Sequence, residues 1–267
     1  TLSSGENNGG ACGHDGDSNP LMSCVSPTFS RKASVMHDLP DMKGATIAFD
    51  LDGTLVDSAP DLVSSLNALL AEEGLPCLTF EHIMTMVGAG AWKLVQRGFA
   101  AAGEPLDESH KPRIFGRFLE IYTARIAVQT RPYPGCLEAL EALAGAGATL
   151  VVCTNKLTGL SVALLDALDM TSRFAAVIGQ DSAPAAKPDP RHLLTAIAAA
   201  GGTADRAVLV GDSGADFHGA RNADVPVILV PFGYSDVDVR TLEADALCDT
   251  WRDIPAACAR LLSPPPI

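Results

Sequence analysis

Two aspartates, Asp50 and Asp52, stand two residues apart in the run Phe49-Asp50-Leu51-Asp52-Gly53-Thr54. They follow an apolar run, so we expect them at the end of a buried strand, where residues two apart project to the same side. Paired carboxylates of this kind can divide a reaction, because one attacks as a nucleophile while the other transfers protons. An Asp-Gly step also suits an ordinary turn, but a turn alone does not explain two carboxylates after a buried strand.

A second group of carboxylates, Asp212 and Asp216, follows another apolar run in the segment Gly211-Asp212-Ser213-Gly214-Ala215-Asp216. Ligands of open α/β sheets lie beyond the carboxyl ends of the strands, so both groups are predicted to face one crevice. Carboxylates gathered there repel one another unless a cation lies among them. Hard oxygen ligands with room for water favour Mg²⁺, which we therefore expect as the cofactor.

Hydrogen-bond donors and a positive charge come at matching places. The run Cys153-Thr154-Asn155-Lys156 ends a further predicted strand, and Lys187 follows the next one, before a helix that starts near Pro190. A phosphoryl group needs donors on its non-bridging oxygens and a fixed positive charge, for which lysine is the natural point charge. Thr154 or Lys187 alone would be an ordinary surface residue, but both at successive strand ends favour a phosphoryl-transfer site.

The elements that must position these residues are short, near-continuous apolar runs that alternate with helical patterns. Apolar runs without in-and-out alternation are typical of a parallel sheet covered on both faces. The alternation of strands and helices predicts a doubly wound α/β core of the Rossmann-like kind. The predicted strands are Ala45–Leu51, Thr149–Thr154, Ala175–Gly179, Ala207–Gly211 and Pro226–Val230, with an edge strand at Ala246–Cys248 and a last helix near Ile254–Leu262.

Residues 59–131 break this repeat, because they carry helical stripes and no convincing strand. One stripe runs from Leu62 to Leu70 and another from Phe115 to Ile126. We therefore predict a helical cap inserted into a core made of residues 44–58 and 132–267, where it can close over a bound ligand. Residues 1–43 are polar and rich in glycine, and we expect them to form a disordered N-terminal tail.

Composition excludes several kinds of partner. The chain has 267 residues, 5% aromatic residues and a net charge of −13, which argues against nucleic acid because a phosphate backbone would be repelled. No run approaches the ~18 apolar residues of a membrane span. The seven cysteines are scattered, a pattern typical of free thiols in a reducing cytoplasm. We expect a small phosphorylated metabolite as partner, and a monomer and a homodimer stay open.

Taken together, the motifs make the chain resemble the haloacid dehalogenase-like superfamily, and within it the phosphoglycolate phosphatase branch. The run Phe49–Ser58 matches the first motif and Thr154-Asn155 the second, while Lys187 matches the third and Asp212 with Asp216 the fourth. The resemblance covers residues 44 to about 262. An ordered set of four motifs is a specific signal.

The resemblance implies roles for these residues. Asp50 would form an aspartyl-phosphate, while Asp52 would protonate the leaving alkoxide and then activate water. The Asp50 side chain, the Asp52 backbone carbonyl and Asp212 would hold Mg²⁺, with Asp216 supporting that shell or orienting the catalytic Lys187. The residues expected around the substrate phosphate are Thr154, Asn155 and Gly53.

Two further features are less decided by the sequence. Lys93 and Arg97 lie in a cap segment, Val87–Arg97, that resembles the cap of the same branch. Contact with the substrate and a solvated position at a helix start are equally open for both side chains. His192 and His218 lie close to motif residues, but we expect each on a helix surface.

The expected function is Mg²⁺-dependent hydrolysis of a small phosphomonoester, with phosphoglycolate as the favoured substrate and a sugar or amino-sugar phosphate as alternatives. A phosphomutase resembling β-phosphoglucomutase would share every core motif, but it would keep the phosphate until a second sugar hydroxyl accepts it. A haloacid dehalogenase needs neither Asp52 nor magnesium. A non-catalytic binding protein on the same scaffold usually lacks a motif residue, whereas all are present here.

Overall fold

The computed structural model describes residues 39–87, 90–235 and 237–263. Of the predicted tail over residues 1–43, residues 1–38 lie outside these ranges. Residues 39–43 are described, and Met42 is 2% exposed while its N–H donates to the Ala146 carbonyl at 2.7 Å. The packed chain thus begins a few residues before residue 44.

A six-stranded parallel sheet forms the centre of the fold, in the order β5-β4-β1-β6-β7-β8. Its strands are β1 Thr46–Phe49, β4 Thr149–Cys153, β5 Ala176–Ile178, β6 Ala207–Gly211, β7 Val227–Leu229 and β8 Ala246–Leu247. The five predicted strands and the predicted edge strand are confirmed. From β1 the chain first adds strands on one side and later on the other, so β1 lies at the point where the strand order reverses, which is where open α/β sheets bind ligands.

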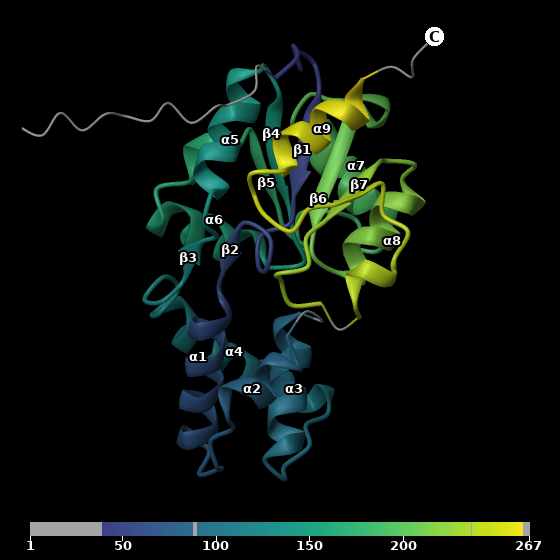
Figure 1. The fold of residues 1–267 in the computed structure, drawn as a ribbon. Helices are drawn as coiled ribbons and strands as arrows, with labels where there is room; N and C mark the ends of the chain where they lie inside the picture. Colours follow the sequence, from purple (N-terminus) through teal and green to yellow (C-terminus); the bar gives the residue numbers. More distant parts are fainter. Residues whose placement is uncertain (1–38, 88–89, 236, 264–267) are drawn as a thin grey trace, which may run out of the picture. The chain divides into compact units, whose positions relative to one another are not determined.

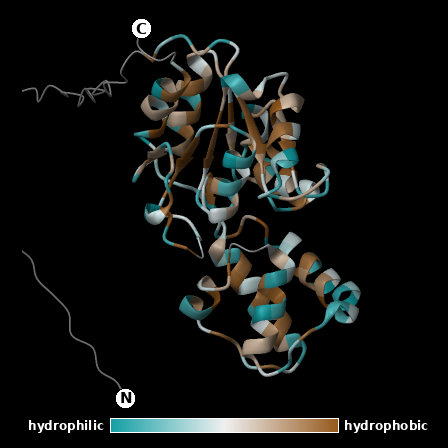
Figure 2. Ribbon diagram, turned by 90° about the vertical axis from the view of Figure 1, so that its right-hand side faces the viewer, coloured by the Kyte–Doolittle hydropathy of each residue, from teal (hydrophilic) through white to brown (hydrophobic). Residues whose placement is uncertain are grey.

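Helices cover both faces of this sheet (Figure 1). One face packs against α5 Cys136–Gly145, α6 Thr158–Ala167 and α9 Ile254–Leu262, and the other against α7 Pro190–Ala199 and α8 Gly214–Asn222. Alternate residues of β1 serve the two cores, since Phe49 points into the first and Ala48 into the second, both fully buried. Figure 2 shows the strands as hydrophobic along their length. Because both faces of the sheet are covered, the strands have near-continuous apolar runs in the sequence.

Four helices form the inserted segment: α1 Ala59–Glu72, α2 Phe80–Met84, α3 Ala91–Ala101 and α4 Lys111–Thr123. Their apolar stripes meet in a shared core in which Leu66, Val95 and Phe118 are fully buried. Helix α1 starts with Pro60 in its first turn and stops before Gly74, whose φ of 73° is a left-handed conformation that suits glycine. In Figure 1 these helices form a group of their own.

The two connections between the helical group and the sheet are tied to each other. Two-residue strands, β2 Val56–Asp57 and β3 Arg131–Pro132, pair in antiparallel fashion. The buried carboxylate of Asp61 in α1 accepts hydrogen bonds from the Thr130 N–H and hydroxyl at 2.8 and 2.7 Å. Two residues are too few to show a strand pattern in the sequence, so this pairing was not predicted.

Short 3₁₀ helices lie in the loops: η1 Glu108–His110, η2 Thr171–Arg173, η3 Ala204–Arg206 and η4 Val239–Thr241. The described helices include none with the length and apolar composition that a membrane crossing needs.

Candidate active site

The loop after β1 carries Asp50 and turns sharply at Gly53. The Asp50 N–H donates to the Val210 carbonyl at 2.9 Å, which extends the β1–β6 ladder by one residue. Gly53 has a φ of 85°, and a Cβ there would lie 2.3 Å from Asp212 Oδ2, so only glycine allows this approach. The Gly53 N–H donates to the Val56 carbonyl at 2.9 Å, so this donor closes the turn.

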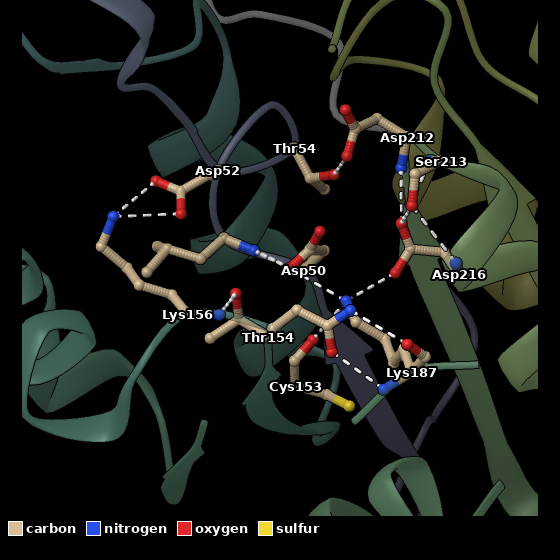
Figure 3. Close-up of polar contacts among 12 residues, drawn as sticks. Asp50, Asp52, Thr54, Cys153, Thr154, Lys156, Lys187, Asp212, Ser213 and Asp216 are labelled. Carbon is tan, nitrogen blue, oxygen red and sulfur yellow. Dashed lines mark hydrogen bonds and ion pairs between the residues drawn. The ribbon is translucent and has the colours of Figure 1, made fainter. Parts of the chain in front are cut away.

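Lys187 joins two of the carboxylates. Its ammonium lies 3.0 Å from Asp50 Oδ1 and 2.6 Å from Asp216 Oδ1, and it donates to the Cys153 carbonyl at 2.8 Å (Figure 3). The Lys187 side chain is 1% exposed. Burial opposes its charge, but the charges of Asp216 and Asp50 outweigh burial and raise the pKa of Lys187. The lysine therefore supplies a permanent positive charge beside Asp50.

Burial changes the acidity of Asp50. Burial raises the pKa of its carboxyl group to about 6, an effect that the charge of Lys187 partly offsets. Its C-terminal neighbour in the turn, Leu51, donates its N–H to Asp50 Oδ1 at 2.8 Å. Within the described ranges, the hydrogen-bond and ion-pair partners of the Asp50 carboxylate all contact Oδ1. This arrangement leaves Oδ2 available to a substrate and a metal ion.

Asp216 supports its neighbours through both carboxylate oxygens. While Oδ1 binds Lys187, Oδ2 accepts the N–H groups of Asp212 and Ser213 at 3.2 and 3.1 Å and the Ser213 hydroxyl at 2.5 Å. Ser213 is the N-cap of α8 and forms a capping box with Asp216. Asp216 is fully buried, so it fixes the start of α8 and the position of Lys187 together.

Asp212 completes the acidic cluster. Its Oδ1 accepts the Thr54 hydroxyl at 2.9 Å and its Oδ2 accepts the Tyr234 N–H at 2.6 Å. Burial, and then the charge of Asp50, raises the pKa of Asp212 well above its usual range. Carboxylate oxygens of Asp50, Asp212 and Asp216 lie within 4.8 Å of one another. Buried hard oxygen ligands with more negative than positive charge fit a divalent cation such as Mg²⁺.

Asp52 lies apart from this cluster. The sequence predicted that Asp50 and Asp52 project to the same side at the end of a strand. This geometry does not apply, because β1 ends at Phe49 and Asp52 already belongs to the turn. Its carboxylate accepts the Ser58 hydroxyl at 2.6 Å and pairs with Lys156, whose ammonium lies 3.1 Å from Oδ2. Figure 3 shows Asp50 between this pair and the pair formed by Lys187 and Asp216.

Thr154 follows β4 and is 2% exposed. Its hydroxyl oxygen accepts the Lys156 N–H at 3.2 Å. Asn155 binds the loop of Lys187 at both ends of its amide, because it donates to the Lys187 carbonyl at 3.0 Å and accepts the Lys187 N–H at 2.8 Å. The side chain of Asn155 is thus directed at the lysine loop, whereas the sequence placed it on the phosphate.

His192 is fully buried, so the expectation of a surface position was wrong. Helix α7 packs against β4 and β5, and His192 Nε2 lies 3.3 Å from the Ile178 carbonyl in β5. Its Nδ1 accepts the Lys187 N–H at 3.1 Å, and burial, followed by the charge of Lys187, lowers the pKa of His192.

A cavity opens above these residues, and the helical group supplies its apolar wall. The wall residues are Leu62, Val87, Ala91, Leu94, Phe115 and Leu119. Asp50, Asp52, Thr154, Lys156 and Asp212 line the polar base.

The structure does not bring Lys93 and Arg97 to this cavity. Both side chains are exposed on α3, and Arg97 donates to the Met86 carbonyl at 3.0 Å. The face of α3 that lines the cavity carries Ala91 and Leu94 instead.

Three residues to which the sequence assigned no role reach the site, namely Lys156, Tyr122 and Tyr234. The ammonium of Lys156, in the loop after β4, donates to the hydroxyl of Tyr122 in α4 at 2.7 Å, which joins this loop to the helical group. Tyr234 connects the acidic cluster to the start of α1, because its hydroxyl contacts Asp57 and accepts the Ala59 N–H at 3.1 Å. Lys156 was visible as the neighbour of Thr154-Asn155, but Tyr122 has the spacing of an ordinary core residue.

Comparison with known proteins gives a consistent result. The family model described as haloacid dehalogenase-like hydrolase matches residues 47–230. The phosphoglycolate phosphatase of Caulobacter vibrioides is 57% identical over 228 residues, which cover 85% of this chain and 96% of that protein. The phosphoglycolate phosphatase of Agrobacterium fabrum is 46% identical over 216 residues, covering 80% of this chain and 93% of that protein. The crystal structure of a predicted phosphoglycolate phosphatase from Haemophilus somnus matches with a TM-score of 0.74 at 32% identity, covering 80% of this chain and 96% of that one.

Proposed function

The chain belongs to the haloacid dehalogenase-like hydrolases and is a phosphatase, and we propose that phosphoglycolate is its substrate and Asp50 its nucleophile. The observation that carries the proposal is the placement of Asp50, with Oδ1 held 3.0 Å from Lys187 and the carboxylate inside the acidic cluster. A nucleophile needs one oriented oxygen and a positive charge for the phosphoryl group that it receives, and this placement supplies both.

In the proposed reaction, Asp50 Oδ2 attacks phosphorus in line with the leaving oxygen, and the P–O bond to that oxygen breaks. Asp52 gives a proton to the leaving alkoxide and later takes one from the water that attacks the phosphorylated Asp50. Water then releases inorganic phosphate and restores the carboxylate. Thr154 binds a non-bridging oxygen, and Lys187 supplies positive charge from beneath the phosphoryl group, beside Asp50. The side chain of Asn155 keeps Lys187 in position through its two backbone contacts.

We propose that Mg²⁺ is held by Asp50, Asp212 and the backbone carbonyl of Asp52. The buried carboxylate cluster supports this assignment, since oxygens of Asp50, Asp212 and Asp216 lie within 4.8 Å of one another. When bound, the ion supplies positive charge to the phosphoryl oxygens. Asp216 is assigned a supporting role, because both of its oxygens already bind Lys187 and the start of α8.

We further propose that residues 59–131 act as a cap that excludes bulk water from the phosphorylated aspartate. The apolar wall that these helices give to the cavity supports this role. A cytoplasmic location is proposed from the cysteines, since those in the described ranges are all free thiols. Fractionation of the source cells would test the location.

The test of the substrate is a panel of phosphomonoesters that contains phosphoglycolate, glucose 6-phosphate, an amino-sugar 6-phosphate and p-nitrophenyl phosphate. We expect phosphoglycolate to have the highest kcat/KM, with phosphate released in Mg²⁺ and none released in EDTA. No sugar bisphosphate should be needed, which separates hydrolysis from the phosphomutase reaction. A higher kcat/KM for a sugar phosphate would overturn the substrate assignment.

A further inference from the structure

The cavity has an uneven distribution of charge. Among the described residues that line it, Asp50, Asp52 and Asp212 are carboxylates, and Lys156 is the one cation. Its other wall is apolar. A charged group buried without a partner costs several kcal/mol, so an anionic part of a ligand can be placed here only where a cation meets it. Lys156 is the group in the cavity lining that meets this need.

Lys156 is held in the charged state and in one place. Its side chain is 7% exposed, and its ammonium contacts Asp52 Oδ2 at 3.1 Å and the Tyr122 hydroxyl at 2.7 Å. Burial opposes its charge, but the charge of Asp52 outweighs burial and raises the pKa of Lys156. The Tyr122 ring also lies against it, with the ammonium 4.5 Å from the ring centre.

The two buried lysines serve different parts of the site. Lys187 is 1% exposed, binds Asp50, Asp216 and a backbone carbonyl, and does not line the cavity. It therefore lies beneath the position of the phosphoryl group. Lys156 contacts Asp52 (Figure 3), the residue assigned to the leaving oxygen. It therefore lies on the side of the leaving group.

We propose that Lys156 is the residue that selects substrates with an anionic leaving group, by binding a carboxylate that the leaving group carries. The inference rests on the proposed function, in which Asp52 lies against the leaving oxygen. In phosphoglycolate a single CH₂ group separates the ester oxygen from the carboxylate carbon, so the carboxylate comes within reach of an ammonium that touches Asp52. Tyr122 positions that ammonium from the opposite wall. The favoured substrate class is small phosphomonoesters with a carboxylate next to the ester carbon.

A purely structural role for Lys156 makes a different prediction. If the lysine acted only by orienting Asp52, its removal would lower kcat/KM by the same factor for every substrate, because all of them need the same proton transfer. If it binds the leaving group, removal weakens anionic substrates more than neutral ones. The two roles are therefore separated by a ratio of rates and not by one rate.

The experiment compares kcat/KM for phosphoglycolate and for ethyl phosphate, which has the same carbon chain without the carboxylate, in the wild type and in Lys156→Met. Both values should fall in the variant, since Asp52 loses a partner. The value for phosphoglycolate should fall about 10–100-fold further, the range expected for loss of a hydrogen bond to a charged group. Lys156→Arg keeps the charge and should recover much of the preference. Lys43→Met removes an exposed lysine outside the cavity and should leave the preference unchanged.

Equal loss on both substrates in Lys156→Met, or no loss on either, overturns the inference. Lys156→Gln keeps a polar side chain and provides a second charge-free variant if the methionine variant does not fold. Failure of the proposed function looks different, because then the wild type itself shows no preference for phosphoglycolate. That result would overturn both claims, whereas equal loss in the variants would leave the proposed function standing.

Discussion

The buried carboxylates of Asp50 and Asp212 lower the stability of the folded protein when they are charged and no metal is bound. Burial raises the pKa of Asp50 to about 6 and that of Asp212 well above its usual range. A carboxylate whose pKa is higher in the folded than in the unfolded protein stabilises the fold fully below the unfolded pKa. That contribution is lost as the pH rises through the folded pKa. The metal-free protein should therefore lose stability between about pH 4 and pH 6 on account of Asp50. Asp212 should add a further loss as the pH rises through its own raised pKa.

Asp50→Asn should stabilise the metal-free protein at neutral pH, because it removes the buried charge and keeps the shape of the side chain. The raised pKa corresponds to about 1–3 kcal/mol after allowance for the lost ion pair with Lys187. Urea unfolding in EDTA at pH 7.5 measures this gain, which should fade when the same comparison is made near pH 4. A variant less stable than the wild type at pH 7.5 would show that the Lys187 pair outweighs the burial of Asp50.

Asn155→Ala should lower kcat about 10–100-fold, because Lys187 loses the two backbone contacts that fix its loop. Steady-state kinetics with phosphoglycolate measures the effect, and circular dichroism checks the fold. Asn222→Ala is the matched control, since Asn222 binds the neighbouring Pro188 carbonyl at 3.2 Å from an exposed position. A similar loss in both variants would mean that the Asn155 contacts are not special to the site.

The sequence predicted the site residues that follow strands, but it did not predict the contacts between residues that are distant in the chain. Asp50, Thr154, Lys187 and Asp212 each follow a strand whose apolar run is readable, so their meeting at one edge follows from the parallel sheet. The contact between Lys156 and Tyr122 joins residues 34 apart in different elements, and nothing local encodes it. Tyr122 in particular has the spacing and the burial of an ordinary core residue.

At the scale of elements, the sheet was predictable and the connections to the helical group were not. Strands buried on both faces leave continuous apolar runs, and β1, β4 and β6 are fully or almost fully buried. The pairing of β2 with β3 produces no such apolar run. In the sequence, Asp61 looks like an ordinary polar residue of a helix. Its buried contact with residues 129–130 depends on how the chain returns from the cap.

Asp61→Ala should destabilise the protein by about 2–4 kcal/mol, because the N–H groups of Gln129 and Thr130 lose a buried acceptor. Urea unfolding at pH 7.5 measures the change. Asp107→Ala removes an exposed carboxylate that caps η1 and should cost no more than about 1 kcal/mol. Equal losses in the two variants would show that Asp61 does not tie the connections together.

Helix α3 presents two faces that kinetics can distinguish. Ala91→Phe adds a ring to the apolar wall of the cavity and should raise KM for phosphoglycolate at least about 10-fold. Lys93→Ala and Arg97→Ala change exposed side chains and should leave kcat/KM within about 2-fold. A large loss in either of the latter variants would restore these residues as contacts of the substrate.

For the whole molecule, the net charge of −13 makes the local cations of the site necessary. A field of this sign repels an anionic substrate at long range, so attraction must come from charges close to it. Lys187 and Lys156 are both buried beside carboxylates that keep them charged. The site lies where the strand order reverses, and the inserted helices add an apolar wall over it.

Phosphorylation of Asp50 is the step on which the proposed mechanism depends, and it can be detected by trapping the intermediate. A reaction with phosphoglycolate and Mg²⁺ is stopped within the first turnover and treated with borohydride, which reduces an aspartyl-phosphate to homoserine. The protein is then mapped by mass spectrometry of its peptides. We expect homoserine at position 50 and none without substrate. Homoserine at Asp52 or Asp212, or substrate phosphate bound to a protein in which Asp50 stays unreduced, would contradict it.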